Sequence, residues 1–278
     1  MRFGVETSRR PLLEFIGGWI ADRIADLTFA ILRCQRRAAA ANVARVLAVT
    51  PDSPVVHALV RQAFRSSVRN VLALVAIRLL RQQWHPPIVF EFADEEGREV
   101  GRPAIVISAH LGPFDVVGAL LGAQGYRITA LAAPMRPRWL DQIVRALRSA
   151  PGITLLMPTR QGLRQAIEAI ASQESVVFLV DRNVLGNGRT IKFFGVPTRL
   201  PDGPVRLARR LGCSLVPVFC YRMGRRYVVR IERPIVVPRS DDAEKDVHSA
   251  LETMVQVLEQ AIQRAPDQWL VFSPVWPR

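Results

Sequence analysis

The chain has 278 residues, 49% of them hydrophobic, which is enough for one large α/β domain and excludes an intrinsically disordered protein. Its formal net charge is +14, and arginine supplies almost all of the excess because Lys192 and Lys245 are the only lysines. Arginine suits phosphates and carboxylates, so we expect anionic partners. Nucleic acid, an anionic membrane, phosphate-bearing thioesters and acidic carrier proteins all remain possible on charge alone.

Three cysteines at positions 34, 213 and 220 form an odd set without metal-ligand spacing, which favours a reducing compartment and predicts no metal site. No signal peptide is evident. Residues 11–34 are apolar, but charged side chains interrupt them, so we do not expect this stretch to cross a bilayer. The interruptions are Glu14, Asp22, Arg23 and Asp26.

Residues 11–37 are predicted to form one long helix with two apolar surfaces. One is a stripe of aliphatic residues at three- and four-residue steps. The other carries Phe15, Trp19 and Phe29. We interpret the second surface as a contact with a membrane or a partner, and a helix buried on both sides is the alternative. The stripe consists of Leu13, Ile16, Ile20, Ile24, Leu27 and Ile31.

Further helices follow, separated by a turn at 50–52, so residues 1–87 are expected to be mainly helical. A short strand begins at residue 88. Strands and helices then alternate from residue 103, which predicts parallel βαβ units. A hairpin is expected to turn at 223–224, and the last helix to open at 240–242. We therefore predict a single domain (1–278) of the α/β class, in which helices flank a mostly parallel central sheet in residues 88–278.

The segment AIVISAHLGPFD predicts a buried strand that ends at His110, followed by a Gly-Pro turn and a helix that carries Asp115 in its first turn. This layout can place a carboxylate beside an imidazole, which could then remove a proton from a hydroxyl. The structural alternative is that Asp115 caps the helix and His110 is a core residue. No serine nucleophile adjoins His110, so transfer directly to a bound hydroxyl is favoured over an acyl-enzyme.

Two further motifs lie later in the chain. The triplet Asp181-Arg182-Asn183 closes the strand SVVFLV, and Asp181, like His110, ends a strand, where ligands of parallel sheets gather. A turn with a local ion pair is the alternative. Phe193-Phe194-Gly195 could wall an apolar slot or form an ordinary core strand. The chain has no P-loop, zinc-finger spacing or G-x-S-x-G elbow.

Together these motifs resemble the lysophospholipid acyltransferase-like family. The resemblance is strongest to its branch of bacterial lipid A secondary (lauroyl/myristoyl) acyltransferases and phosphatidylinositol mannoside acyltransferases. The blocks that carry it are HLGPFD, FLVDRNV, IKFFGVPTRLPDGPVRLARRLG, LVPVF and PDQWLVF. Three features differ from the family pattern. Pro113 replaces a polar residue, the amino-terminal helix is interrupted by charges, and residues 189–192 before FFG contain no acid.

The resemblance implies a glycerolipid-acyltransferase-like fold and a peripheral O-acyltransferase on the cytoplasmic face of the bacterial inner membrane. It implies His110 as general base oriented by Asp115, acyl-CoA or acyl-carrier protein as donor, a lipid or glycolipid hydroxyl as acceptor, an anionic membrane surface, no cofactor and no nucleic acid. A nucleic-acid-binding protein and a catalytically degenerate lipid-binding protein are the alternatives. The expected substrate-binding residues are Arg136, Asp181, Arg182, Asn183, Phe194, Gly195 and Arg199.

Overall fold

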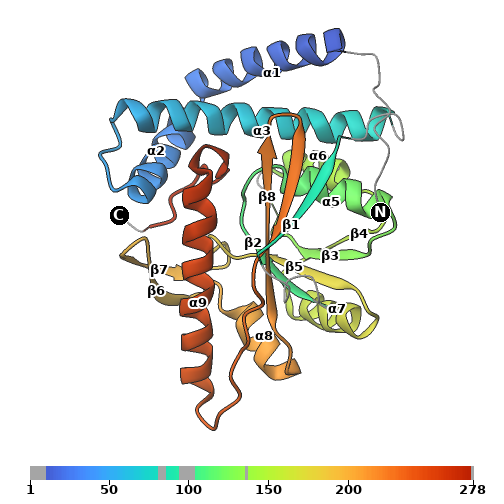
Figure 1. Cartoon of the computed structure of the whole chain (residues 1–278), viewed down its shortest axis with the longest axis vertical. Coiled ribbons are helices and arrows are strands. Elements are labelled where there is room, and N and C mark those ends of the chain that lie inside the picture. Colours follow the sequence, from blue (N-terminus) through green and yellow to red (C-terminus); the bar gives the residue numbers. More distant parts are fainter. Residues whose placement is uncertain (1–10, 81–85, 94–103, 135–136, 277–278) are drawn as a thin grey trace.

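The computed structural model describes residues 11–80, 86–93, 104–134 and 137–276. Three helices come first, α1 (Pro11–Ile31), α2 (Arg33–Leu47) and α3 (Pro54–Leu80) (Figure 1). The predicted helical region is confirmed, but the single helix expected over 11–37 is two helices. The chain bends at Leu32, whose φ and ψ are −82° and 64°. No glycine or proline marks this bend, which turns α2 toward the carboxyl-terminal segment.

The way α1 packs on α3 differs from the expectation. Ala21, Ala25 and Phe29 are its buried apolar residues, and carboxylates on the same side bind arginines of α3. Asp22 lies 2.6 Å from Arg69, while Asp26 lies 2.8 Å from the Arg61 guanidinium and also pairs with Arg65. Because these ion pairs join α1 to α3, the charged face of α1 packs against the protein. The aliphatic stripe therefore faces outward.

The outward stripe comprises Ile20, Ile24, Leu27 and Ile31, whose exposed fractions range from 41% to 65%, and Trp19 beside it is 60% exposed. Phe29, expected on the exposed surface, is buried instead. The side chains of Leu13, Phe15 and Ile16 lie outside the described part of the chain. Within the described residues, α1 therefore has a large apolar face that nothing covers; of the predicted contact surface it includes Trp19 but not Phe29, and the aliphatic stripe makes up the rest.

A seven-stranded sheet forms the centre of the molecule, in the order β1-β9-β8-β2-β5-β3-β4. All its pairs are parallel except β8 with β9, which confirms the predicted α/β class with a mostly parallel sheet. The strands are β1 (Ile88–Phe92), β2 (Ile105–Ser108), β3 (Ile128–Leu131), β4 (Ile153–Leu156), β5 (Ser175–Leu179), β8 (Leu215–Met223) and β9 (Arg226–Ile231).

Helices cover both faces of this sheet. Alternate residues of β8 point to opposite sides, as the two-residue period of a strand requires. Phe219 and Tyr221 join a core with α8 and α9, whereas Val218 and Cys220 join a core with α3 and α5. The remaining elements are α5 (Phe114–Ala123), α6 (Arg138–Arg148), α7 (Arg160–Ala171), the separate hairpin β6 (Arg189–Phe193) and β7 (Val196–Leu200), α8 (Gly203–Leu211), α9 (Ala243–Arg264) and the 3-10 turn η2 (Pro266–Gln268).

Two local predictions are confirmed. β8 and β9 form an antiparallel hairpin that turns after Met223. Asp242 caps α9, since its carboxylate accepts a hydrogen bond from the backbone N–H of Lys245 at 3.0 Å. In Figure 1, β8 points toward α3, and β2, β5 and β3 pair in parallel in the same direction. The carboxyl ends of these four strands therefore lie along one edge of the sheet, and residues that follow the strands meet there.

Candidate active site

His110 and Asp181 meet because their strands are neighbours. β2 and β5 pair in parallel with Ser108 opposite Leu179, and two more residues along each strand bring His110 opposite Asp181. The His110 ring Nδ1 lies 2.8 Å from Asp181 Oδ1. The backbone N–H of His110 donates to the other carboxylate oxygen at 3.0 Å. The register of the parallel sheet thus fixes the imidazole against this carboxylate.

Asp181 is fully buried, and three hydrogen bonds hold it. In addition to the two from His110, the indole Nε1–H of Trp269 donates to Oδ2 at 2.8 Å. Burial alone would raise the pKa of the Asp181 carboxyl, but attraction to the imidazole and these hydrogen bonds keep that pKa below its usual value. Asp181 is therefore a carboxylate in the folded protein.

The expected contact between His110 and Asp115 gives way to a different pairing. Asp115 Oδ2 accepts a hydrogen bond from Arg148 of α6 at 2.9 Å, because the first turn of α5 directs this side chain across to the neighbouring helix. Asp181, which was predicted as a substrate-binding residue, contacts the His110 imidazole instead of Asp115. The structure thus corrects the predicted partner of His110.

The turn after His110 depends on a glycine. Gly112 has φ +59°, and a Cβ atom there would collide with the backbone carbonyl oxygen of Cys220. Its N–H donates to the carbonyl of Gln268 at 2.8 Å, and its carbonyl accepts from Asn70 Nδ2 at 2.8 Å. The backbone N–H of Leu270 donates to the carbonyl of His110 at 2.7 Å. Together these bonds hold the backbone on both sides of the imidazole.

Three of the residues that hold this site were not among the predicted site residues: Asn70, Gln268 and Trp269. The block PDQWLVF contributes to the family resemblance, but the sequence alone indicates no role for Trp269 in the site, although its indole completes the hydrogen bonds of Asp181. The available signal is the tryptophan at the start of the apolar run Trp269–Phe272, because a buried indole N–H needs an acceptor.

The other predicted substrate-binding residues lie in different surroundings. Arg182 follows Asp181 and donates to Ser273 Oγ at 3.1 Å, while its buried Nε has no hydrogen-bond partner within the described ranges. Asn183 accepts from the N–H of Gly186 at 3.0 Å, which stabilises the following turn. Arg199 is exposed on β7.

Phe194 and Gly195 form the turn of the β6–β7 hairpin, both at positive φ. The backbone N–H of Phe194 donates to the Glu259 carboxylate, and its ring packs against Phe193 and Trp276. These contacts give the FFG motif a structural role in joining the hairpin to α9 and the carboxyl-terminal segment. Arg136 lies outside the described residues.

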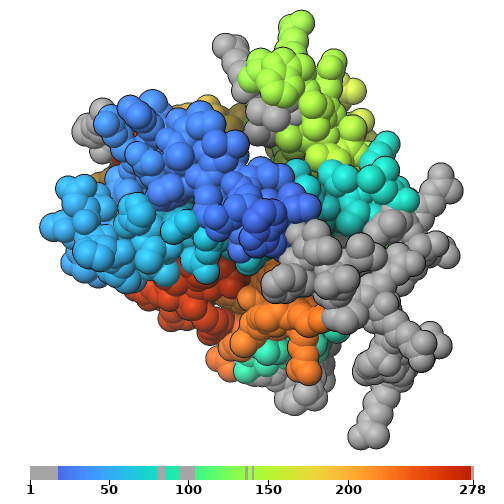
Figure 2. Space-filling model, turned by 90° about the horizontal axis from the view of Figure 1, so that it is seen from above, coloured from blue at the N-terminus to red at the C-terminus, as the bar shows by residue number. Residues whose placement is uncertain are grey.

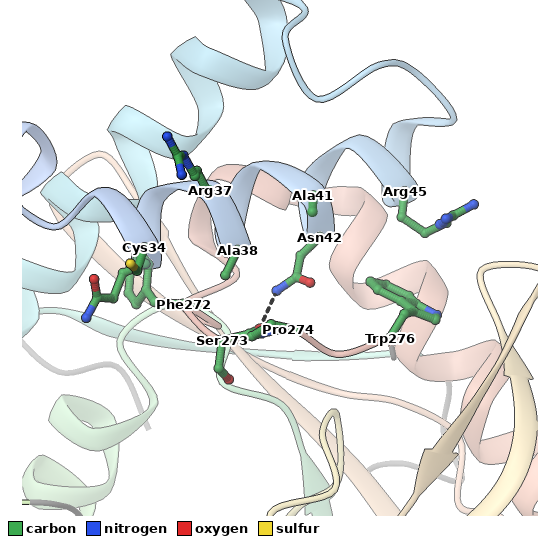
Figure 3. Close-up of a pocket in the computed structure, with 11 residues that line it drawn as sticks. Cys34, Arg37, Ala38, Ala41, Asn42, Arg45, Phe272, Ser273, Pro274 and Trp276 are labelled. Carbon is green, nitrogen blue, oxygen red and sulfur yellow. Dashed lines mark hydrogen bonds between the residues drawn. The ribbon is translucent and has the colours of Figure 1, made fainter. Parts of the chain in front are cut away.

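A cavity of about 480 Å³ lies between α2 and the carboxyl-terminal segment (Figure 3). Asn42 points from α2 into this region and donates to the backbone carbonyl of Ser273 at 2.8 Å. The Ser273 hydroxyl points away from α2 toward Arg182. The segment thus separates the cavity from the His110–Asp181 pair, and neither of these two residues lines it.

Chemically, the pair forms a base with a fixed orientation. With Nδ1–H donating to Asp181, the other ring nitrogen, Nε2, has its lone pair available to accept a proton. The His110 side chain is 17% exposed, and the Phe114 ring packs edge-to-face on it at 5.6 Å between centroids. Among the residues described, no group of three or more His, Cys, Asp or Glu side chains could hold a metal ion.

The His110–Asp181 pair places an oriented base at the carboxyl ends of adjacent parallel strands, where ligands of such sheets bind, and a base of this kind can take a proton from a hydroxyl. Residues 13–278 match the family of bacterial lipid A biosynthesis acyltransferases. The chain belongs to this family, and it is an acyltransferase that acts on lipid or glycolipid acceptors.

Its relatives include phosphatidylinositol mannoside acyltransferases of mycobacteria. The protein from Mycobacterium tuberculosis H37Rv is 28% identical over 244 residues, which are 84% of this chain and 75% of that protein. The one from Mycolicibacterium smegmatis is 27% identical over 182 residues, 64% of this chain and 58% of that protein. The crystal structure of the 1-acyl-sn-glycerophosphate acyltransferase PlsC from Thermotoga maritima aligns with 87% of this chain and 97% of that chain, at 14% identity and a TM-score of 0.39.

None of the helices in the described ranges is long and apolar enough to cross a membrane.

Proposed function

We propose that His110 is the general base of an O-acyl transfer and that Asp181 is the residue that orients it. The observation that carries this proposal is the chain of hydrogen bonds from the partly exposed His110 through the buried Asp181 to the buried Trp269, at the carboxyl ends of β2 and β5. The fixed carboxylate selects the ring tautomer with the proton on Nδ1 and stabilises the imidazolium that forms.

The donor is an acyl thioester, acyl-CoA or acyl-carrier protein, because a thioester carries the activation that direct transfer needs. The acceptor hydroxyl gives its proton to His110 Nε2 as its oxygen attacks the thioester carbonyl. The tetrahedral intermediate then expels the thiolate, which takes the proton from the imidazolium. The products are an ester and a free thiol, and the histidine returns to its neutral form.

Arg182 is our first choice for binding anionic groups of the substrates. It adjoins Asp181, and its guanidinium has hydrogen-bonding capacity left beyond the bond to Ser273. A guanidinium near the reacting carbonyl would also stabilise the developing oxyanion. Asn183 and Arg199 would bind substrate more weakly than Arg182, because both side chains make hydrogen bonds to Gly186 in the loop that follows β5.

We further propose that the enzyme works at an anionic membrane surface, on the cytoplasmic side of the inner membrane, with a glycolipid as acceptor. Two observations support the membrane contact. The aliphatic stripe of α1 is exposed, and the chain carries a net charge of +14, which favours anionic phospholipid. The names of the mycobacterial relatives support a glycolipid acceptor.

The direct test replaces His110 with alanine. We expect His110→Ala to reduce the turnover of acyl-CoA with a glycolipid acceptor by at least about a hundredfold, the usual scale for loss of a general base. His248→Ala is the matched control, because His248 lies on α9 and is largely exposed. Near-normal turnover by a folded His110→Ala protein would refute the proposed base.

A further inference from the structure

α6 presents an apolar surface that nothing in the described structure covers. Trp139 is 61% exposed and Ile143, one turn later, is 50% exposed. After Arg138, the charged residues of α6 are all partly buried: Arg145 pairs with Asp141 at 2.9 Å, and Arg148 pairs with Asp115. As in α1, the carboxylates of this helix face the protein while bulky apolar side chains face outward.

α6 and α1 belong to the same side of the molecule. α1 packs on α3, and Arg78 of α3 donates to the carbonyl of Ala146 in α6 at 2.8 Å. Figure 2 shows α1 in blue and α6 in yellow-green on one face. The two most exposed tryptophans of the described structure, Trp19 and Trp139, lie on these two helices.

α6 is also joined to the candidate active site. It follows the carboxyl end of β3, at the same sheet edge as His110. Its last turn holds Arg148, whose ion pair with Asp115 fastens α6 to α5. α5 begins at Phe114, directly after the turn that follows His110. The inner side of α6 is thus connected through α5 to the turn that follows His110.

The chemistry of this surface favours a lipid bilayer as its partner. Tryptophan and isoleucine next to arginine are the composition of an interfacial helix, since the indole prefers the headgroup region and the guanidinium pairs with phosphate. Arg138 is exposed beside Trp139, and the Arg23 guanidinium lies 5.9 Å from the centre of the Trp19 ring. Each of the two helices thus carries an exposed arginine close in sequence to its exposed tryptophan.

We infer that α6 is a second lipid-contacting helix, whose Trp139 and Ile143 enter the headgroup region of the bilayer on which α1 lies. Contact through both helices holds the carboxyl ends of β2 and β3, and so His110, against the membrane that contains the acceptor. The inference rests on the proposed function, because it takes the acceptor to be a membrane lipid.

Tryptophan quenching tests the contact directly. The full chain is mixed with vesicles of phosphatidylcholine and phosphatidylglycerol that carry brominated acyl chains. The Trp19→Phe protein retains Trp139, and the Trp19→Phe/Trp139→Phe protein gives the background of the other tryptophans. We expect quenching in the first protein to exceed that background clearly. Equal quenching in the two proteins would overturn the inference.

A charge substitution provides an independent measurement. Trp139→Glu/Ile143→Glu should weaken partitioning into anionic vesicles by roughly tenfold. The new carboxylates are repelled by the anionic vesicle surface, and the variant no longer buries the two apolar side chains in lipid. Its circular dichroism and melting temperature should stay near those of the unmodified protein, since both residues are exposed. Unchanged partitioning would contradict the inference. A change of oligomeric state without weaker partitioning would contradict it too, because the surface would then bind a second copy of the chain.

The outcomes separate this inference from the proposed function. If Trp139 is quenched but the His110→Ala protein remains active, the lipid contact stands and the proposed catalytic role fails. If Trp139 is not quenched while Trp19 is, membrane binding through α1 stands and the role of α6 fails.

Discussion

Gly112 is the residue that lets the chain turn sharply after His110. Its φ of +59° and the lack of space for a Cβ beside the carbonyl of Cys220 make two demands that only glycine meets. The nearby carbonyl of His110 accepts a hydrogen bond from the backbone N–H of Leu270. A shift of this turn would therefore move the imidazole relative to Asp181.

Gly112→Ala should therefore lower both stability and turnover. We expect a loss of at least about 2 kcal/mol in the free energy of unfolding, since backbone strain and a collision act together. Denaturant titration measures this change. Gly118→Ala, in the middle of α5, is the control, because no heavy atom lies within 4 Å of the added Cβ; it should be neutral or stabilising by up to about 1 kcal/mol. Equal effects of the two substitutions would contradict this account of the turn.

The sequence indicates which residues belong to the site better than it indicates which of them contact each other. His110 and Asp181 were both assigned to strand ends, which is where the structure has them. Their contact depends on β2 and β5 being neighbours in the sheet, although more than 60 residues and two other strands separate them in the chain. Proximity in the sequence favours Asp115 as the partner, and only the position of α6 reveals that Arg148 binds this carboxylate.

At the scale of elements, α1 is the clearest case in which a charged face packs inward. Its carboxylates bind a row of arginines on α3, and its largest aliphatic residues are left exposed. Periodicity correctly predicted a helix with apolar surfaces. It did not identify the buried one, because the choice depends on Arg61, Arg65 and Arg69 of a different helix.

Replacing the exposed stripe should affect membrane binding without affecting the fold. We expect Ile24→Ser/Leu27→Ser/Ile31→Ser to weaken binding to anionic vesicles by at least about tenfold, since each side chain loses apolar area that lipid would bury. Sedimentation with vesicles measures the binding. Val236→Ser is the control, because Val236 is 74% exposed next to the start of β8, at the opposite end of that strand from α1. Undiminished binding of the triple variant would show that α1 is not the contact.

At the scale of the whole molecule, the amino-terminal helices and the sheet share the carboxyl-terminal segment. Asn42 of α2 is 2% exposed and donates to the carbonyls of Val271 and Ser273 at 3.1 and 2.8 Å. Phe64 of α3 packs on Phe272 with ring centroids 4.7 Å apart. The same segment contains Trp269, so these contacts link the helices to Asp181.

We predict that residues 1–87 and 88–278 unfold as one cooperative unit. Asn42→Ala should lower the melting temperature of the entire protein, because it leaves the buried carbonyl of Val271 and the partly buried carbonyl of Ser273 without their donor, at a cost of about 1–3 kcal/mol. Differential scanning calorimetry measures this effect. A second, separate transition in the unmodified protein or in the variant would indicate two independent domains.

The central claim is that Asp181, rather than Asp115, orients the catalytic histidine, and a comparison of Asp181→Asn with Asp115→Asn tests it most directly. Both variants are assayed for kcat with the same acyl-CoA and glycolipid, after circular dichroism has shown that they are folded. We expect kcat to fall at least about a hundredfold in Asp181→Asn, because the amide no longer stabilises the imidazolium, and much less in Asp115→Asn, which loses only its ion pair with Arg148. A folded Asp181→Asn enzyme with near-normal kcat, or an equally damaging Asp115→Asn, would contradict the claim.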